Sequence, residues 1–295
     1  MPMTNPKWVE AGGILTRYFE AGRGENLVLF HGGSVGAPNL CECAIDWELN
    51  FDNLARRYHV YAPDKLGQGH TDLPLCDADY TMTAVVRHAH DFLVALDIRE
   101  AHVVGHSRGG FVVCRLALDH PDRIRSCIIV DSNTLAPGLP PSQFVLANPP
   151  APRLSRDSQR WVLERYSLDP SHITDSLLDA VCEAASLPSI RESLDKMEAC
   201  GLRRRQFLPA LARERTDTFA RLRDNGLQRP ALVVWGRNDP TAGLAQGEAL
   251  FDLIASRQPQ AMMTVINNAG HFCFREQARP FESTISGFIE CVDGW

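Results

Sequence analysis

The chain has 295 residues, of which 44% are hydrophobic, so it can form one large domain or a domain with an insertion. Its formal charge of −6 disfavours a surface that binds nucleic acid or an anionic membrane, and no apolar run is long enough to span a bilayer. The N-terminal residues hold no apolar segment of the signal-peptide type, and nine scattered cysteines are typical of reduced thiols, so we expect a cytoplasmic protein.

Short apolar segments alternate with helical segments along the first half of the chain. We expect strands at 14–20, 26–30, 59–62 and 124–130, and a further short strand from residue 101 to a tight turn that contains Gly105. Between them, we expect one helix with Trp47, Phe51 and Leu54 on a single face, a second at 82–96, and a third from about 108 to 120. This order predicts an α/β fold with a mainly parallel central sheet that helices cover on both faces.

The alternation stops after Asp131 and resumes near residue 231. Six prolines fall between 137 and 152, and the residues that follow, up to about 222, are helical and charged without a clear strand. An insertion of this length favours a cap over a functional site rather than a loop. We therefore divide the chain into a first core part (1–134), a helical cap (135–222) and a second core part (223–295), which holds strands at 231–235 and 263–266 and a helix at 280–291.

One turn has the residues expected of a nucleophile. Gly105, Ser107 and Gly109 form Gly-x-Ser-x-Gly between an apolar strand and a helix. A serine in such a tight turn adopts a strained conformation, and its neighbours must be small because the strand and helix backbones pass close together. The free N–H groups and partial positive charge at the start of the helix suit a developing oxyanion.

This segment resembles the nucleophile elbow of the α/β-hydrolase superfamily, and the resemblance covers the chain from about residue 13 to its end, except the cap. It implies an enzyme with a catalytic triad in the chain order serine, acid, histidine. Asp239 follows one predicted strand, and His271 lies in Asn-Asn-Ala-Gly-His-Phe after the next, at the same edge of a parallel sheet. We assign Ser107 as nucleophile, His271 as general base and acid, and Asp239 as the orienting acid.

The triad acid has an alternative candidate, and the resemblance also implies an oxyanion hole. Asp131, at the end of the strand after the elbow, is a second place where the superfamily positions its acid. The His-Gly-Gly segment at 31–33 implies, by the same resemblance, an oxyanion hole formed by the backbone N–H groups of Gly33 and Arg108.

Within the superfamily, the segment from His31 to Tyr80 is most similar to the meta-cleavage-product hydrolases. These enzymes cut a carbon–carbon bond in a diketone derived from an aromatic ring, after a dienol becomes a ketone, and hold a carboxylate with a cap arginine. Arg108 and Arg191 are the candidates to bind such a carboxylate, although each could instead pair with an acid of the fold or with solvent. The chain departs from that subfamily at His106, where asparagine is usual, and at Phe272, where tryptophan is usual.

The resemblance predicts a serine hydrolase that acts on a small carboxylate-bearing molecule, best described as a 2-hydroxy-6-oxo-dienoate. It implies no metal or organic cofactor and no nucleic-acid or membrane partner, and it leaves open whether the protein forms homo-oligomers. Hydrolysis of a carboxylic ester or a lactone is the alternative reaction. A ligand receptor built on the same fold is the alternative from another class.

Overall fold

A computed structural model describes residues 3–138 and 145–293. Eight strands form one sheet in the order β1-β2-β4-β3-β5-β6-β7-β8. The β1–β2 and β2–β4 pairs are antiparallel, and all the other neighbouring strands are parallel. The strands are β1 Lys7–Ala11, β2 Ile14–Gly22, β3 Asn26–Phe30, β4 His59–Pro63, β5 Ala101–His106, β6 Ile124–Val130, β7 Ala231–Gly236 and β8 Ala261–Ile266.

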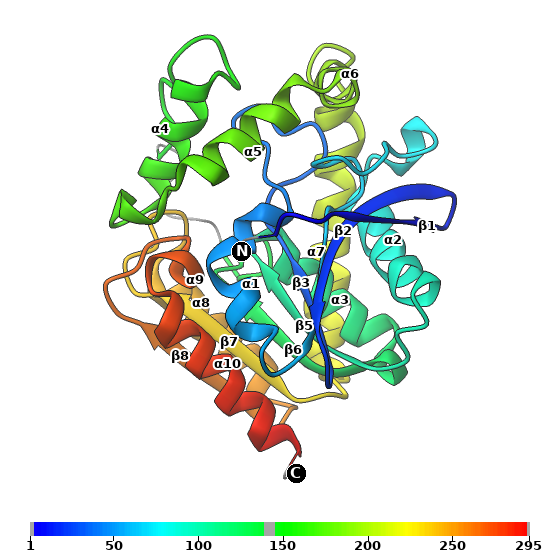
Figure 1. The fold of residues 1–295 in the computed structure, drawn as a ribbon. Helices are drawn as coiled ribbons and strands as arrows, with labels where there is room; N and C mark the ends of the chain where they lie inside the picture. The colour runs from blue at the N-terminus through cyan, green and yellow to red at the C-terminus, as the bar shows by residue number, and fades with distance from the viewer. Residues whose placement is uncertain (1–2, 139–144, 294–295) are drawn as a thin grey trace.

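Helices cover both faces of this sheet (Figure 1). Apolar residues of α2, α3, α7 and α8 form the core on one face, and those of α1, α9 and α10 contribute to the core on the other. None of the described helices is long and apolar enough to cross a membrane. Outside the cap, the helices are α1 Glu48–Leu54, α2 Met82–Ala95, α3 Arg108–Asp119, α8 Leu244–Ala255, α9 Cys273–Glu276 and α10 Ala278–Asp293.

The central strands are apolar on both sides because each side meets a layer of helices. Successive residues of β5 alternate between the cores, with Val103 in one and Val104 in the other. The same alternation places Leu232 and Val233 of β7 in opposite cores. This double burial explains why these strands appear in the sequence as continuous apolar runs.

The structure confirms the predicted fold class, and the predicted strands match β2 to β8 with small changes at their ends. It adds β1, which the sequence analysis did not predict. Four of the five residues of Lys7–Ala11 are exposed or half-buried, and only Ala11 is buried. An edge strand whose side chains mostly face solvent does not have to be apolar, so its hydrophobic pattern did not predict a strand.

Residues 145–222 of the expected cap are helical, and the structure describes no strand there. The helices are α4 Arg156–Tyr166, α5 Asp175–Ser186, α6 Pro188–Met197 and α7 Leu208–Asp224. Residues 139–144, including Pro140 and Pro141, lie outside the described part of the chain. In Figure 1, α4, α5 and α6 lie above the sheet, whereas α7 runs down beside α3.

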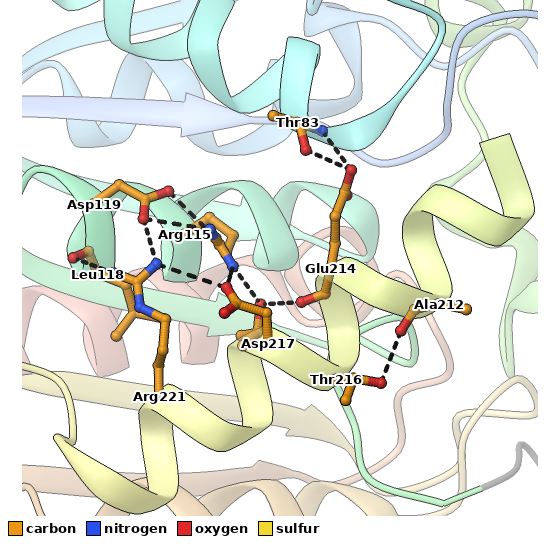
Figure 2. A network of polar contacts seen from close by, with 10 residues as sticks. Thr83, Arg115, Leu118, Asp119, Ala212, Glu214, Thr216, Asp217 and Arg221 are labelled. Carbon is orange, nitrogen blue, oxygen red and sulfur yellow. Dashed lines mark hydrogen bonds and ion pairs between the residues drawn. The ribbon is translucent and has the colours of Figure 1, made fainter. Parts of the chain in front are cut away.

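Polar contacts attach α7 to the helices of the core (Figure 2). Arg115 of α3 donates from Nη1 to Asp217 Oδ2 at 2.6 Å, and Arg221 of α7 donates from Nη1 to Asp119 Oδ1 at 2.5 Å. Glu214 accepts the backbone N–H of Thr83, at the start of α2, at 3.2 Å. The last helix of the expected cap therefore packs on the core and anchors the insertion to it.

The elbow provides a test of how the fold positions the site. A Cβ on Gly105 would lie 2.0 Å from the carbonyl oxygen of Gly109, so Gly105→Ala must push β5 and α3 apart. We expect this variant to lose about 3 kcal/mol or more of its free energy of unfolding, measured by urea denaturation. Gly287→Ala in α10 is the control, because a Cβ there meets no atom within 4 Å, and it should gain about 0.5–1 kcal/mol. Equal stability of the two variants would contradict the prediction.

Candidate active site

Ser107 lies at the junction between β5 and α3. Its backbone has φ 52° and ψ −116°, a strained conformation for a residue with a side chain. Two hydrogen bonds hold it there: its N–H donates to Val130 O at 2.8 Å, and the Ser132 hydroxyl donates to its carbonyl oxygen at 2.6 Å. The residue predicted to be the nucleophile is therefore fixed at the carboxyl end of the sheet, at the first turn of a helix.

His271 and Asp239 meet in the loops that follow β8 and β7. Nδ1 of His271 lies 2.8 Å from Asp239 Oδ2, and the two residues are only 4% and 6% exposed. The other carboxylate oxygen, Oδ1, accepts the backbone N–H groups of Thr241 at 2.7 Å and Ala242 at 3.3 Å. A carboxylate that accepts from Nδ1 leaves the Nε2 lone pair of the neutral ring free to accept a proton.

The contact with Asp239 also sets the charge preference of His271. Burial alone lowers the pKa of an imidazole, but the negative charge of Asp239 and the hydrogen bond to it outweigh burial and raise the pKa of His271 to about 9. The site therefore stabilises the imidazolium, which is the form that histidine takes after it accepts a proton from a nucleophile.

Asp131, the alternative acid, is held differently. Its Oδ1 accepts the backbone N–H of Gly236 at 2.7 Å, and no hydrogen bond joins it to His271 among the described residues. Burial and the nearby charge of Asp239 raise the pKa of Asp131 well above its usual range. Asp131 is thus a neutral, buried acid that ties β6 to β7, and the structure brings Asp239 rather than Asp131 to the histidine.

A cavity of about 400 Å³ lies between residues of the core and residues of the expected cap. Ser107 and His271 both line it, and Gly33 and Arg108, the predicted oxyanion donors, lie on the same wall. Arg108 is the first residue of α3, so its N–H has no partner within the helix. The remaining lining residues are Ser34, Ala37, Pro38, Asn39, Leu40, Glu42, Asn133, Thr134, Leu146, Val162, Tyr166, Glu198, Arg203 and Thr241.

Two arginines line the cavity, and one of them was not predicted. The Arg108 guanidinium lies 5.1 Å from the centre of the Phe207 ring and has no ion-pair partner in the described chain. Burial and the positive charge of Arg203 lower the pKa of Arg108 to about 10. Arg203 donates to Gly36 O at 2.6 Å and pairs with Glu198. Two neighbouring, half-buried cations, of which Arg108 has no ion-pair partner among the described residues, favour an anionic ligand.

Arg191, the predicted cap arginine, does not line this cavity. It lies on α6 with its side chain exposed to solvent. Arg203 takes the inward position because it begins a π-helical turn, η5 Arg203–Phe207, that directs Arg203 and Phe207 toward Arg108. The run Arg203-Arg204-Arg205 was the available signal, but residue periodicity does not reveal a π turn.

Three further residues of the cavity were also missed. Thr241 places its hydroxyl 3.1 Å from His271 Nδ1, beside the contact with Asp239. Tyr166 receives the backbone N–H of His271 on its carbonyl oxygen at 2.8 Å. Glu42 is a carboxyl group in the cavity wall, and it was not predicted because it lies in an irregular loop. In the described residues, no three His, Cys, Asp or Glu side chains gather as a metal ion requires, and all nine cysteines are free.

Comparison with known proteins agrees with this geometry. The profile of a family described as the alpha/beta hydrolase fold matches residues 25–278. A 2-hydroxymuconate semialdehyde hydrolase of Pseudomonas sp. is 30% identical over 287 residues, which cover 96% of this chain and 93% of that protein. A 2-hydroxy-6-oxo-2,4-heptadienoate hydrolase of Pseudomonas putida is 28% identical over 97% of each chain. The solved structure of a meta-cleavage product hydrolase from Pseudomonas fluorescens is 25% identical, has a TM-score of 0.77, and covers 96% of this chain and 97% of its own.

Replacement of Asp239 and replacement of Asp131 should have different effects on activity. Asp239→Asn should lower kcat by about 10⁴-fold, because an amide no longer fixes the tautomer or stabilises the imidazolium. In the wild type, kcat/KM should rise with pH as His271 loses its proton near pH 9. In Asp239→Asn this rise should occur at a lower pH, because Asp239 raises the pKa of His271. Asp131→Asn should change little, because an amide replaces an acid that is already neutral. A large loss in Asp131→Asn alone, measured by steady-state kinetics from pH 6 to pH 10, would transfer the role to Asp131.

Proposed function

Since the chain belongs to the alpha/beta hydrolase fold family, we propose that it hydrolyses a carbon–carbon bond in a 2-hydroxy-6-oxo-dienoate produced by aromatic ring fission. Ser107 is the nucleophile, His271 the general base and acid, and Asp239 the orienting acid. The observation that carries the proposal is one cavity that holds Ser107 and His271 beside two arginines suited to a carboxylate. The activities of similar hydrolases support the same reaction.

The geometry suits the following sequence of bonds. After the dienol has become a 2,6-diketone, Ser107 Oγ bonds to C6 while its proton passes to His271 Nε2. The C6 oxyanion accepts the backbone N–H groups of Gly33 and Arg108. The C5–C6 bond then breaks, its electron pair passes along the conjugated chain to the 2-oxo oxygen, and His271 returns the proton. Water, with His271 as base, finally splits the acyl-serine ester to a carboxylic acid.

The substrate carboxylate binds between Arg108 and Arg203 in this proposal. The Arg108 guanidinium makes no ion pair within the described chain and stands on an aromatic ring, which leaves its N–H groups available. Arg203 is already oriented by Gly36 and Glu198, so little side-chain entropy is lost on binding. We also infer a cytoplasmic protein that acts without a metal or organic cofactor. Its nine free cysteines support that location, and we make no proposal about its oligomeric state.

The reaction is tested by supplying an aryl 2-hydroxy-6-oxo-dienoate and a p-nitrophenyl ester to the wild type and to Ser107→Ala. We expect the wild type to consume the coloured dienoate with a higher kcat/KM than the ester. We expect Ser107→Ala to lose about 10⁴-fold or more in kcat, because it removes the proposed nucleophile. Loss of dienoate absorbance and release of p-nitrophenolate are the measurements. Turnover of the ester alone would establish an esterase instead.

The arginine assignment is tested by Arg203→Met with Arg191→Met as the matched control. A lost hydrogen bond to a charged carboxylate costs about 1.5–3 kcal/mol, so Arg203→Met should lower kcat/KM for the dienoate by about 10- to 100-fold. The methyl ester of the same dienoate should be affected far less, because it carries no negative charge there. Arg191→Met should behave as the wild type with both compounds. An equal loss with the acid and its methyl ester would mean that Arg203 supports the cap rather than the substrate.

A further inference from the structure

Glu42 places a carboxyl group against the loop that is expected to form the oxyanion hole. It follows β3, lines the cavity with Ser107 and His271, and is only 9% exposed. Its two oxygens lie over consecutive glycines. A Cβ on Gly32 would be 2.1 Å from Oε1, and a Cβ on Gly33 would be 2.6 Å from Oε2. Both positions must therefore be glycine for the carboxyl to reach this part of the wall.

No hydrogen-bond donor of the described residues reaches this carboxyl. His106 Nδ1 lies 3.9 Å from Oε1, which is too distant for a hydrogen bond. That nitrogen is also an acceptor, because the other ring nitrogen, Nε2, lies 2.9 Å from the carbonyl oxygen of His271 and must donate to it. Buried polar groups in proteins almost always have a partner. A buried carboxyl that faces a catalytic cavity without one indicates that its partner is the substrate.

The surrounding charges favour the protonated form of Glu42. Burial raises its pKa, and the positive charges of Lys65, His271 and Arg108 lower it less than burial raises it. Lys65 is itself buried, donates from Nζ to Gly33 O at 2.9 Å, and has its pKa lowered to about 7. The other titratable groups around this position are Cys41, His106, Asp46 and Tyr166. Burial thus favours the uncharged form of both the Glu42 carboxyl and the Lys65 amine in this wall.

We propose that Glu42 is a further catalytic residue, whose carboxyl O–H donates a hydrogen bond to the reacting oxygen of the substrate beside the backbone N–H of Gly33. The proposal rests on the proposed function of Ser107. When Ser107 attacks, the carbonyl oxygen becomes an oxyanion, and a neutral acid stabilises it while keeping its own proton. An ionised carboxylate at the same place would repel the oxyanion, so the role requires the acid form.

The test compares Glu42→Gln and Glu42→Ala, with Glu183→Gln on the exposed face of α5 as the control. The glutamine amide still donates a hydrogen bond, so kcat should stay within about tenfold of the wild type. The alanine variant should lose about 10²- to 10³-fold in kcat with little change in KM, as for the loss of one oxyanion donor. Glu183→Gln should match the wild type. Equal losses in the glutamine and alanine variants would overturn the proposal.

The pH dependence of kcat separates this role from a structural one. In the wild type, kcat should fall on the alkaline side as Glu42 loses its proton, whereas Glu42→Gln should lack this fall because an amide does not titrate. An unchanged alkaline limb in Glu42→Gln would overturn the proposal. This comparison needs only the glutamine variant, so it decides the question even where the alanine variant fails to fold in a thermal melt.

Inhibition by phenylboronic acid distinguishes failure of this proposal from failure of the proposed function. The boronic acid forms a tetrahedral anion on an active serine and imitates the oxyanion whichever bond the enzyme naturally cleaves. We expect its inhibition constant to rise about 100-fold in Glu42→Ala and less than tenfold in Glu42→Gln. Equal inhibition of the wild type and both variants would overturn the role of Glu42 alone. Absence of inhibition in the wild type, together with full activity of Ser107→Ala, would overturn both proposals.

Discussion

The close contact between β5 and α3 is the constraint on which the site depends. Only hydrogen atoms separate the backbone at Gly105 from that at Gly109, since a Cβ on Gly105 would lie 2.0 Å from the Gly109 carbonyl oxygen. The turn between them forces Ser107 to a positive φ, which costs about 1–3 kcal/mol. β5 is buried against helices on both faces of the sheet, so the surrounding core over-determines this conformation. The packing of β5 on both faces of the sheet therefore holds Ser107 in its strained conformation.

Asp239 and Asp131 both lie near the His271 imidazole, because the segments that follow parallel strands meet at one edge of the sheet. Burial and hydrogen-bond donors determine which of the two acids carries the negative charge. Asp239 receives backbone N–H groups and the histidine, which together stabilise a carboxylate. Asp131 has no comparable set of donors, and the charge of Asp239 further disfavours its ionisation. One negative charge therefore faces His271, and the second acid acts as a neutral link between β6 and β7. Sequence position alone could not separate the two, because both follow a strand of the same sheet.

The sequence was most informative where one physical requirement controlled the residues. Double burial produced the apolar runs of β3, β5 and β6; β3 and β6 were predicted with their ends correct, whereas β5 extends to His106, past the expected start of the turn at Gly105. β1 was missed because it is an edge strand with mainly exposed side chains. Arg203 was missed because its direction depends on a π turn, and Glu42 because an irregular loop has no period to read. Both errors concern where a side chain points, which is decided by tertiary packing and not by local pattern.

The cavity also links the cap to the chemistry through one loop of the core. Arg203 of the expected cap donates to Gly36 O, and Lys65 donates to Gly33 O, so two side chains hold the same short segment after β3. That segment carries the proposed oxyanion donor at Gly33, and Glu42 lies against it. A substrate carboxylate that draws Arg203 would therefore act on the loop that must receive the oxyanion. Substrate recognition and stabilisation of the reacting oxygen both depend on this segment. A substitution in the expected cap that changes substrate specificity should therefore also change the reaction rate.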